Sequence, residues 1–324
     1  MLHPPEDLDE TVLAAALTRE WGVVAAEMTY RPLGFGSHHW SVVDRAGHAW
    51  FATVDDLDRK RLSGQETHDS AYARLRSSLD AARGLRDTGA TFVVAPVTTA
   101  GDEPLARLGP RLALSLFPLV TGDSFGFGEY DGDGHRQAVL EMLLGVHGAP
   151  AHVRDRAPAD DQAVQHRDAL EAAIGDAGFP DTGPYARRVA DLFAENRRPI
   201  RRVLQRYDDL AAGVDPARAV LTHGEPHSGN TMRTPDGWRL IDWDTALVSQ
   251  PERDLWILGA DVQRAYTAAT GVPLQPELLE MYRLRWDIVD VTIVADRFRS
   301  SHAGTADDAQ SWSILQRVVT GLPR

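Results

Sequence analysis

The chain has 324 residues, of which 43% are hydrophobic and 25% are charged, an ordinary globular composition. It contains no cysteine, which excludes disulfides, thiolate metal sites and cysteine nucleophiles. Its formal net charge of −13 has the wrong sign for a protein that grips nucleic acid phosphates. No apolar run approaches the roughly 20 residues that span a bilayer, and the acidic N-terminus lacks the pattern of a signal peptide. We therefore expect a cytoplasmic protein with neither a membrane nor a nucleic acid partner.

The first third of the chain alternates between helix and strand patterns. Residues 8–20 have an acidic start followed by good helix formers, which predicts a short helix. Residues 22–54 have a β-type pattern with glycine-containing turns, and residues 66–88 repeat apolar positions at helical spacing. FVVAPV (92–97) and RLALSLFPLV (111–120) predict two further strands. Together these segments predict a small α+β unit.

The rest of the chain is mostly helical, with one β-type interruption. Helices are predicted at 134–148, 161–175, 184–212, 252–268 and 275–300. At 219–247, two short strands flank a polar loop. We therefore expect an α+β fold with a β-rich lobe of residues 1–118, a hinge near 116–123 and a larger helical lobe of residues 119–324.

The stretch LTHGEPHSGN (221–230) concentrates polar residues between two predicted strands. The following TMRT, PDG and WRLI predict a β-hairpin whose turn centres on Asp236. Asn230 and Asp242 are each six residues from this centre, so a regular hairpin would place them opposite each other. Glu225 lies in the loop at the same end. Such a set suits Mg²⁺ and leaves one carboxylate free to accept a proton from a hydroxyl.

Two other interpretations of this loop remain open. Its polar residues could simply satisfy the backbone of a solvated turn, although Asp244 adds a further carboxylate close to Asp242. His223 and His227 have a spacing found in zinc sites. They lack the helix-borne H-E-x-x-H pattern, however, and the glycines and proline of the loop argue against a helix.

HGEPHSGN, followed by LIDWD and ERDLW, resembles the catalytic segment of aminoglycoside phosphotransferase-like kinases, which usually reads H-G-D-x-x-x-x-N and then I-D-W. The resemblance extends over essentially the whole chain and implies a bilobal protein-kinase-like fold. The later part, with RWDIVD, looks most like the spectinomycin phosphotransferase branch. The resemblance implies that Glu225 is the catalytic base and that Asn230 and Asp242 are Mg²⁺ ligands. It also implies that His223 and Asp254 brace the loop.

The resemblance further implies a site for ATP or GTP with Mg²⁺. The hinge backbone near Phe117 and Leu119 would bind adenine. In the turn GFGSHH, Gly34, Gly36 and Ser37 would cover the phosphates, although an ordinary hairpin turn is the alternative.

Two departures from the family pattern concern catalysis. Glu225 stands where the family usually has Asp, and the extra methylene moves the carboxylate by about 1 Å, which matters for the reacting geometry. Thr53 stands where the family has the lysine of the small lobe, and threonine cannot neutralise the phosphates. Lys60, Arg74 or Arg76 could supply that charge instead.

Acidic residues recur at helical spacing near the C-terminus. Glu280, Asp287 and Asp290 share one face of the predicted helix. Residues 119–324 carry 31 acidic against 22 basic residues, which favours a cationic ligand. Asp287 and Asp290 are therefore candidate contacts to substrate ammonium groups. The alternative is a solvated face whose acids pair with neighbouring arginines.

The sequence thus predicts an ATP- and Mg²⁺-dependent O-phosphotransferase. Its substrate would be a small, cationic, hydroxylated antibiotic, and phosphorylation would confer resistance. One alternative is a kinase of a small metabolite such as a sugar or amino alcohol. A nucleotide-binding, pseudokinase-like module without turnover is another, motivated by Thr53 and Glu225. The pair Asn230 and Asp242 argues against it, because an inactive site has no need of both metal ligands.

Overall fold

The computed structural model describes residues 1–5, 7–34, 36–175 and 179–323. The chain forms two compact units, each assembled from segments that are distant in sequence. The first unit comprises Met1–Lys60, His68–Asp160 and Asp215–Leu274, and the second comprises Arg61–Thr67, Asp161–Val214 and Gln275–Arg324. The lobe boundary expected at residue 118 stays a prediction.

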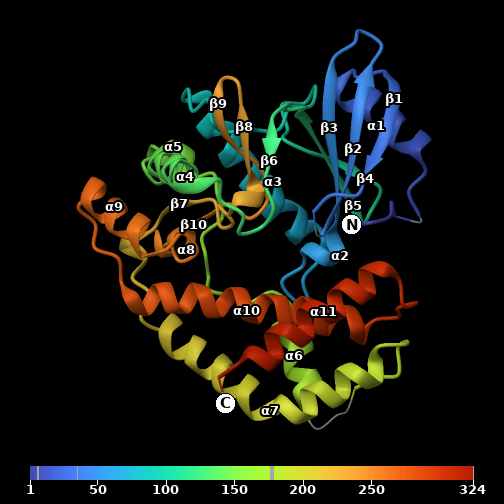
Figure 1. The fold of residues 1–324 in the computed structure, drawn as a ribbon. Coiled ribbons are helices and arrows are strands. Elements are labelled where there is room, and N and C mark those ends of the chain that lie inside the picture. The colour runs from blue at the N-terminus through green and yellow to red at the C-terminus, as the bar shows by residue number, and fades with distance from the viewer. Residues whose placement is uncertain (6, 35, 176–178, 324) are drawn as a thin grey trace. The chain divides into compact units, whose positions relative to one another are not determined.

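A five-stranded antiparallel sheet forms the β-rich part of the first unit (Figure 1). Its strands, in spatial order, are β1 (Ala25–Arg31), β2 (Ser37–Asp44), β3 (Ala49–Asp56), β5 (Leu112–Pro118) and β4 (Ala106–Leu108). Alternation along β3 buries Ala52 and Val54 in the core. Thr53 and Asp55 therefore point to the opposite face. The register pairs Asp55 with Ser37, which brings the glycine-containing turn beside the end of β3.

Helix α1 (Glu10–Trp21) packs against the core face of this sheet. The Asp9 carboxylate accepts a hydrogen bond from a backbone N–H in its first turn. Gly22 ends the helix at φ 69°, a left-handed conformation that glycine adopts without strain. Leu13 and Leu17 are fully buried, as the apolar spacing of the segment requires.

The segment 92–97 is not a strand of this sheet, so that prediction is wrong. Its backbone exchanges hydrogen bonds of 2.8 and 3.1 Å with Leu240 and donates one of 2.7 Å to Leu116. Pro96 lacks an N–H, and the bonding is divided between two partners, so the segment cannot extend a regular ladder. Strand β4 occupies the sheet edge instead.

The remaining elements of the first unit surround the polar loop. The helices are α2 (Leu57–Lys60), α3 (His68–Asp87), α4 (Gly132–His147), α5 (Ala151–Arg154), η1 (Pro216–Arg218), η2 (Ser228–Asn230), α8 (Glu252–Leu255) and α9 (Ala260–Thr270). The strands are β6 (Asp123–Ser124), β7 (Val220–Thr222), β8 (Thr231–Thr234), β9 (Gly237–Leu240) and β10 (Leu247–Ser249). Strand β7 pairs with β10, and β6, β8 and β9 form a three-stranded sheet. The helix predicted at 252–268 is divided into α8 and α9, with Gly259 at φ 86° before α9.

The second unit is helical. It consists of α6 (Arg167–Ile174), α7 (Ala186–Ala211), α10 (Pro276–Arg299) and α11 (Ala306–Gly321), and α10 packs against the other three (Figure 1). Helix α6 begins later than the predicted 161–175, and α11 was not predicted. A capping box between Thr305 and Asp308 begins α11.

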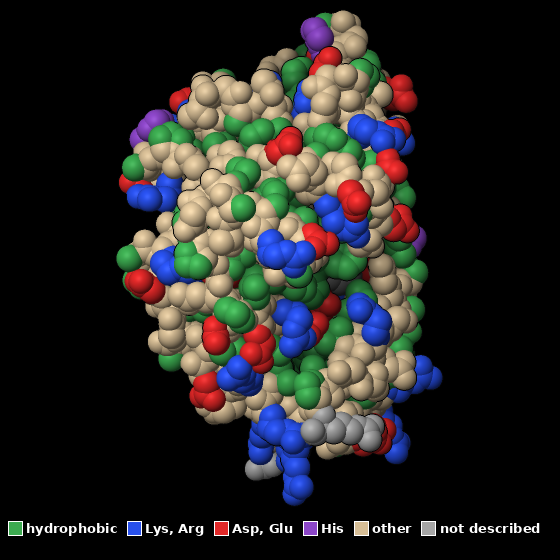
Figure 2. Space-filling model, turned by 60° about the vertical axis from the view of Figure 1, so that its left-hand side comes forward, with side chains coloured by type: hydrophobic (Ala, Val, Ile, Leu, Met, Phe, Trp, Pro, Cys, Tyr) green, Lys and Arg blue, Asp and Glu red, His purple; other side chains and the backbone are tan. Residues whose placement is uncertain are grey.

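The predicted fold class is confirmed: a β-sheet-rich N-terminal region precedes a mainly helical C-terminal part. Among the described residues, no helix is both long and apolar enough to cross a bilayer. On the face shown in Figure 2, acidic and basic side chains are intermingled, so the net charge of −13 does not form one continuous acidic surface there.

Candidate active site

The carboxylate of Asp254 supports the polar loop from within the first unit. It accepts hydrogen bonds from the backbone N–H groups of His223 at 2.9 Å and Gly224 at 2.6 Å, and from Nε2 of His147 at 3.0 Å. Burial opposes ionisation of Asp254, but the hydrogen bond from His147 and nearby positive charge outweigh it and lower the pKa of this carboxyl. The loop backbone is therefore held on a fully buried anion.

Gly224 cannot be replaced by a larger residue without rearrangement of this support. Its φ of 101° lies in the left-handed region, and a Cβ there would come within 2.3 Å of the Arg253 guanidinium. That guanidinium is itself held by Thr222 Oγ1 and the Thr245 carbonyl, both at 2.8 Å. The glycine after His223 is therefore required for both a steric and a conformational reason.

His223 is fully buried and acts on the backbone. Its Nε2 donates to the Ile241 carbonyl at 2.9 Å, and its Nδ1 accepts the Glu225 N–H at 3.3 Å. Burial lowers the pKa of His223, so the ring is neutral, as these two bonds require. Because both ring nitrogens are engaged, His223 cannot bind a zinc ion together with His227.

The carboxylate of Glu225 remains accessible on this rigid loop. Its side chain is 37% exposed, and one carboxylate oxygen lies 3.8 Å from Nε2 of His227. The Asn230 Nδ2 donates to the Glu225 carbonyl at 3.0 Å, which orients the amide. The Asn230 amide oxygen accepts no hydrogen bond from any residue that the structure describes. An accessible carboxylate and an oriented amide oxygen are thus both present in one loop.

The hairpin after the loop has a different register from the predicted one. The Asn230 carbonyl accepts the Ile241 N–H at 2.9 Å, so Asn230 lies opposite Ile241 rather than Asp242. The cause is a tight turn of two residues, Pro235 and Asp236, whose centre precedes the predicted one. The predicted register, in which Asn230 lies opposite Asp242, is therefore wrong by one residue.

Asp242 leaves the hairpin with φ 68°, in the left-handed region. Reduced hydration raises its pKa, and repulsion from the carboxylates of Asp244 and Glu225 raises it further. The residue keeps exposed surface, so a cation that approached it would relieve this repulsion. Over the described part of the chain, no group of three or more His, Asp or Glu is arranged to hold a metal ion. A Mg²⁺ ion on Asp242 and Asn230 would therefore need oxygens from phosphate and water.

Lys60 joins two separate carboxylates near Asp242. Its Nζ lies 3.1 Å from the Asp55 carboxylate and also contacts that of Asp244. Burial opposes the charge on Lys60, but the two carboxylates reverse this effect and raise its pKa. Burial likewise opposes ionisation of Asp244, and Lys60 overcomes it and lowers the pKa. Asp55 also accepts a 2.6 Å hydrogen bond from Ser37, so this network reaches the glycine-containing turn.

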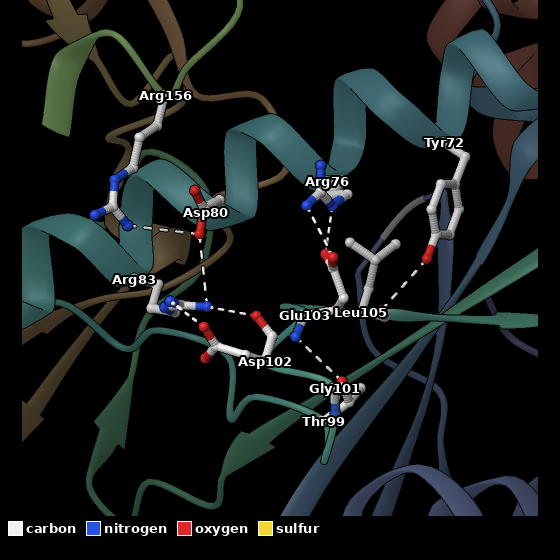
Figure 3. Close-up of polar contacts among 10 residues, drawn as sticks. All are labelled: Tyr72, Arg76, Asp80, Arg83, Thr99, Gly101, Asp102, Glu103, Leu105 and Arg156. Atoms are coloured by element: carbon white, nitrogen blue, oxygen red, sulfur yellow. Dashed lines mark hydrogen bonds and ion pairs between the residues drawn. The ribbon is translucent and has the colours of Figure 1, made fainter. Parts of the chain in front are cut away.

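The sequence analysis identified three cations that could replace the family lysine, whose position is occupied by Thr53. Of these, Lys60 lies in the acidic network just described. The Arg74 guanidinium contacts the backbone carbonyl of Lys60. Arg76 forms an exposed salt bridge with Glu103, with a 2.9 Å contact (Figure 3). Lys60 is therefore the cation that accompanies the candidate metal ligands.

Comparison with known proteins decides the family. The model of the APH family, described as a phosphotransferase enzyme family, matches residues 44–290. The chain belongs to this family. The enzyme class predicted from the sequence, a small-molecule phosphotransferase acting on hydroxyl groups, is confirmed.

Relatives of this APH-family chain cover nearly its whole length. It is 28% identical over 308 residues to Protein StrN of Streptomyces griseus, covering 90% of this chain and 86% of that protein. Spectinomycin phosphotransferase APH(9)-Ia, solved with ADP and spectinomycin, superposes with a TM-score of 0.72 at 16% identity, covering 97% and 98% of the two chains. Amicoumacin kinase hAmiN, solved with AMP-PNP, Ca²⁺ and its ligand Ami, superposes with a TM-score of 0.54 at 14% identity. The superposition covers 98% of this chain and 95% of that chain. These likenesses establish the protein-kinase-like fold.

Within the glycine-containing turn of the APH-family chain, the structure describes Gly34 and Gly36 but not the residue between them. Gly34 and Gly36 have φ values of 64° and 104°, which glycine adopts readily. Ser37 begins β2, and its hydroxyl is directed to Asp55. The role of these residues over the phosphates stays a prediction.

The hinge residues lie at the end of β5. Phe117 pairs with Phe51 of β3, and the Leu119 N–H donates to the Ala49 carbonyl at 3.2 Å. Because that N–H is already bonded, an adenine would use other backbone groups of this segment. Leu119 is 39% exposed and could still contact a base.

Phe127 was missed by the sequence reasoning, although it lies in the conspicuous stretch SFGFGEY. Its ring is 58% exposed and meets the His227 ring edge-on, with centroids 4.8 Å apart. The Ser228 hydroxyl donates to the Gly126 carbonyl at 2.6 Å, which ties the two loops together. The phosphotransferase therefore presents an aromatic surface close to Glu225.

The acidic residues of α10 lie in the second unit. Asp287 is 3.4 Å from Arg283, and burial raises the pKa of its carboxyl. Glu280 pairs with Arg206, at 3.0 Å between Nε and Oε1. Pairing with arginine thus accounts for two of the three acids. The assignment of Asp287 and Asp290 as substrate contacts stays a prediction.

Proposed function

We propose that this chain transfers the γ-phosphoryl group of ATP or GTP to a hydroxyl of a small, cationic antibiotic. The observation that carries the proposal is the accessible Glu225 carboxylate on a braced loop, beside the oxygen ligands Asn230 and Asp242. Phosphoryl transfer needs little covalent chemistry from the protein, so positioning and charge stabilisation account for most of the catalysis.

Glu225 would orient the acceptor hydroxyl and receive its proton. The acceptor oxygen forms a bond to the γ-phosphorus, and the bond from that phosphorus to the β,γ-bridging oxygen breaks, which leaves the nucleoside diphosphate. Asn230 and Asp242 would hold Mg²⁺, whose charge would neutralise the phosphates. Their pairing with Glu225 in one small region favours turnover over a module that only binds nucleotide.

Lys60 would supply the phosphate contact that Thr53 cannot make. Its ammonium is held by Asp55 and Asp244 on the face of β3 that carries Thr53. A short shift of this flexible side chain would exchange a carboxylate for a phosphate oxygen. This possibility also weakens the case for a pseudokinase, which rested in part on the missing lysine.

The substrate class is inferred from relatives and from the surface near Glu225. Spectinomycin and Ami are the ligands named for two proteins of similar fold. Phe127 would pack against the apolar face of a substrate ring, because its exposed ring adjoins the catalytic loop. Asp287 and Asp290 are proposed contacts to substrate ammonium groups.

Nucleoside diphosphate release tests the proposal. The full chain with ATP, GTP and Mg²⁺ is assayed against aminocyclitol and aminoglycoside antibiotics, with amino sugars and amino alcohols as metabolite controls. We expect Mg²⁺-dependent release with at least one antibiotic and phosphorylation of one hydroxyl by mass spectrometry. Release with the metabolites alone would identify a metabolic kinase. Nucleotide binding without release for any acceptor would contradict the proposal.

A further inference from the structure

A pocket of about 480 Å³ lies within the first unit, apart from the loop that carries Glu225. This volume falls within the roughly 300–1,000 Å³ of small-molecule sites. Apolar side chains of residues 93–97, Pro118 and Val120 line part of it. Arg83, Arg86 and Arg239 line it as well.

The lining of the pocket includes none of the residues proposed to contact the nucleotide. Pro118 and Val120 line it, whereas Phe117 and Leu119 do not. Its other wall includes Arg239 on β9. The pocket is thus distinct from the proposed nucleotide site.

Arg83 is neutralised by acidic neighbours. Its guanidinium donates to the Asp102 carbonyl at 2.8 Å and lies 3.3 Å from the Asp102 carboxylate and 3.7 Å from that of Asp80 (Figure 3). The Asp87 carboxylate, which also lines the pocket, lies 3.9 Å from Arg83 Nε. Asp87 and Asp102, the two aspartates that line the pocket, therefore both pair with Arg83.

Arg86 and Arg239 have no such partner. Nη1 of Arg86 donates to two backbone carbonyls, at 2.8 and 3.5 Å, and Nη1 of Arg239 does the same at 3.0 and 3.4 Å. No carboxylate among the described residues lies within ion-pair distance of either guanidinium. No residue in the described part of the chain accepts a hydrogen bond from the Nε or Nη2 groups of either, so these groups can donate to a ligand. In a chain with 47 acidic and 34 basic residues, two such arginines in one pocket select for an anion.

We propose that this pocket binds a small molecule with a dianionic phosphomonoester head and an apolar body. A guanidinium fork matches the geometry of phosphate oxygens, and two forks match a dianion better than a monocarboxylate. The apolar side chains of residues 93–97 would cover the body of the ligand. The backbone of this segment is bonded to Leu240, so the occupant would lie against the strand that leads to Asp242.

Isothermal titration of the full chain with phenyl phosphate tests this site. Saturating AMP-PNP and Mg²⁺ are present to occupy the nucleotide site. We expect one bound equivalent. Arg86→Gln and Arg239→Gln should each weaken binding by about tenfold or more, because each removes hydrogen bonds to a charged group. Phenylacetate should bind more weakly than phenyl phosphate, and phenol should not bind.

Arg76→Gln is the matched control. Arg76 lies on the same helix as Arg86, but its guanidinium pairs with Glu103 outside the pocket (Figure 3). Its loss should leave the affinity unchanged. Should a glutamine variant not fold, Arg86→Lys and Arg239→Lys keep the charge, lose the fork and should still bind less tightly. Absence of phenyl phosphate binding, equal weakening by Arg76→Gln, or unchanged affinity in the pocket variants would overturn the proposal. These outcomes do not depend on turnover.

Discussion

The ammonium of Lys60 lies 3.1 Å from the carboxylate of Asp55, two residues beyond Thr53 on β3. Lys60 follows strand β3 in sequence, yet its ammonium reaches the face of β3 that carries Thr53. Thr53 is the position at which the family has its lysine. Lys60→Met should raise the Michaelis constant for ATP by about tenfold or more, because a charge-assisted contact to phosphate is lost. Steady-state kinetics at varied ATP measure this effect.

Two further variants decide whether that effect is specific. Arg76→Met removes a cation of α3 that pairs with Glu103, and it should leave the Michaelis constant for ATP unchanged. Thr53→Lys in the Lys60→Met background should recover part of the lost affinity. If Lys60→Met and the wild type had equal Michaelis constants for ATP, the phosphates would have to be neutralised by another group.

Glu225→Gln keeps the size of the side chain but cannot accept a proton. Turnover should fall by roughly 10²–10⁴-fold, while nucleotide affinity changes little, because the Asn230 and Asp242 oxygens remain. Turnover and nucleotide titration on the same preparation measure both quantities. Glu225→Asp is the matched variant, because it keeps the base and withdraws it by about 1 Å. A glutamine variant that turns over as fast as the aspartate variant would exclude Glu225 as the base.

The polar loop could be predicted because its determinants are close together in sequence. Glu225 and Asn230 lie in one stretch, and the glycines and proline exclude a helix. The hairpin register was wrong by one residue because the centre of a two-residue turn cannot be located from composition alone. The contact between Lys60 and Asp244 joins positions 184 residues apart, and no local pattern reports it.

The errors in secondary structure have two origins. The run FVVAPV is apolar enough for a strand, but its hydrogen bonds are divided between Leu240 and Leu116. Helix α11 was missed even though the sequence TADD contains the residues of its capping box. Gly259 interrupts a stretch that otherwise has helical spacing. Tertiary partners decided the first case, whereas local signals were available in the other two.

Gly224→Ala should destabilise the loop for two reasons. The left-handed φ of 101° disfavours a side chain, and the added Cβ meets the Arg253 guanidinium. Gly271 has φ 71° but no atom within 4 Å of such a Cβ, so Gly271→Ala isolates the conformational cost of about 1 kcal/mol. Chemical denaturation should therefore show a larger loss for Gly224→Ala, accompanied by a loss of turnover. Equal losses of stability would mean that Arg253 moves aside freely.

Burial lowers the pKa of His39 to about 4. Because the unfolded chain binds this proton near pH 6.5, His39 should reduce the free energy of unfolding as pH falls from about 6.5 to about 4. The slope is at most about 1.4 kcal/mol per pH unit. Denaturation at several pH values should show a weaker dependence for His39→Gln than for the wild type. His48→Gln, at a side chain that is 69% exposed, is the control. An identical slope in His39→Gln and the wild type would contradict this origin.

Phe127→Ala should impair use of the acceptor without impairing use of the nucleotide. The ring is 58% exposed and adjoins His227, so its removal takes apolar surface from beside the loop that carries Glu225. Loss of a partly buried aromatic contact should raise the acceptor's Michaelis constant by about tenfold, with the ATP constant unchanged. Phe127→Tyr keeps the ring and should stay close to the wild type. Val272→Ala removes another exposed apolar side chain of the first unit and is the control. A parallel rise in the acceptor and ATP constants would show that Phe127 supports the catalytic loop rather than contacting the substrate.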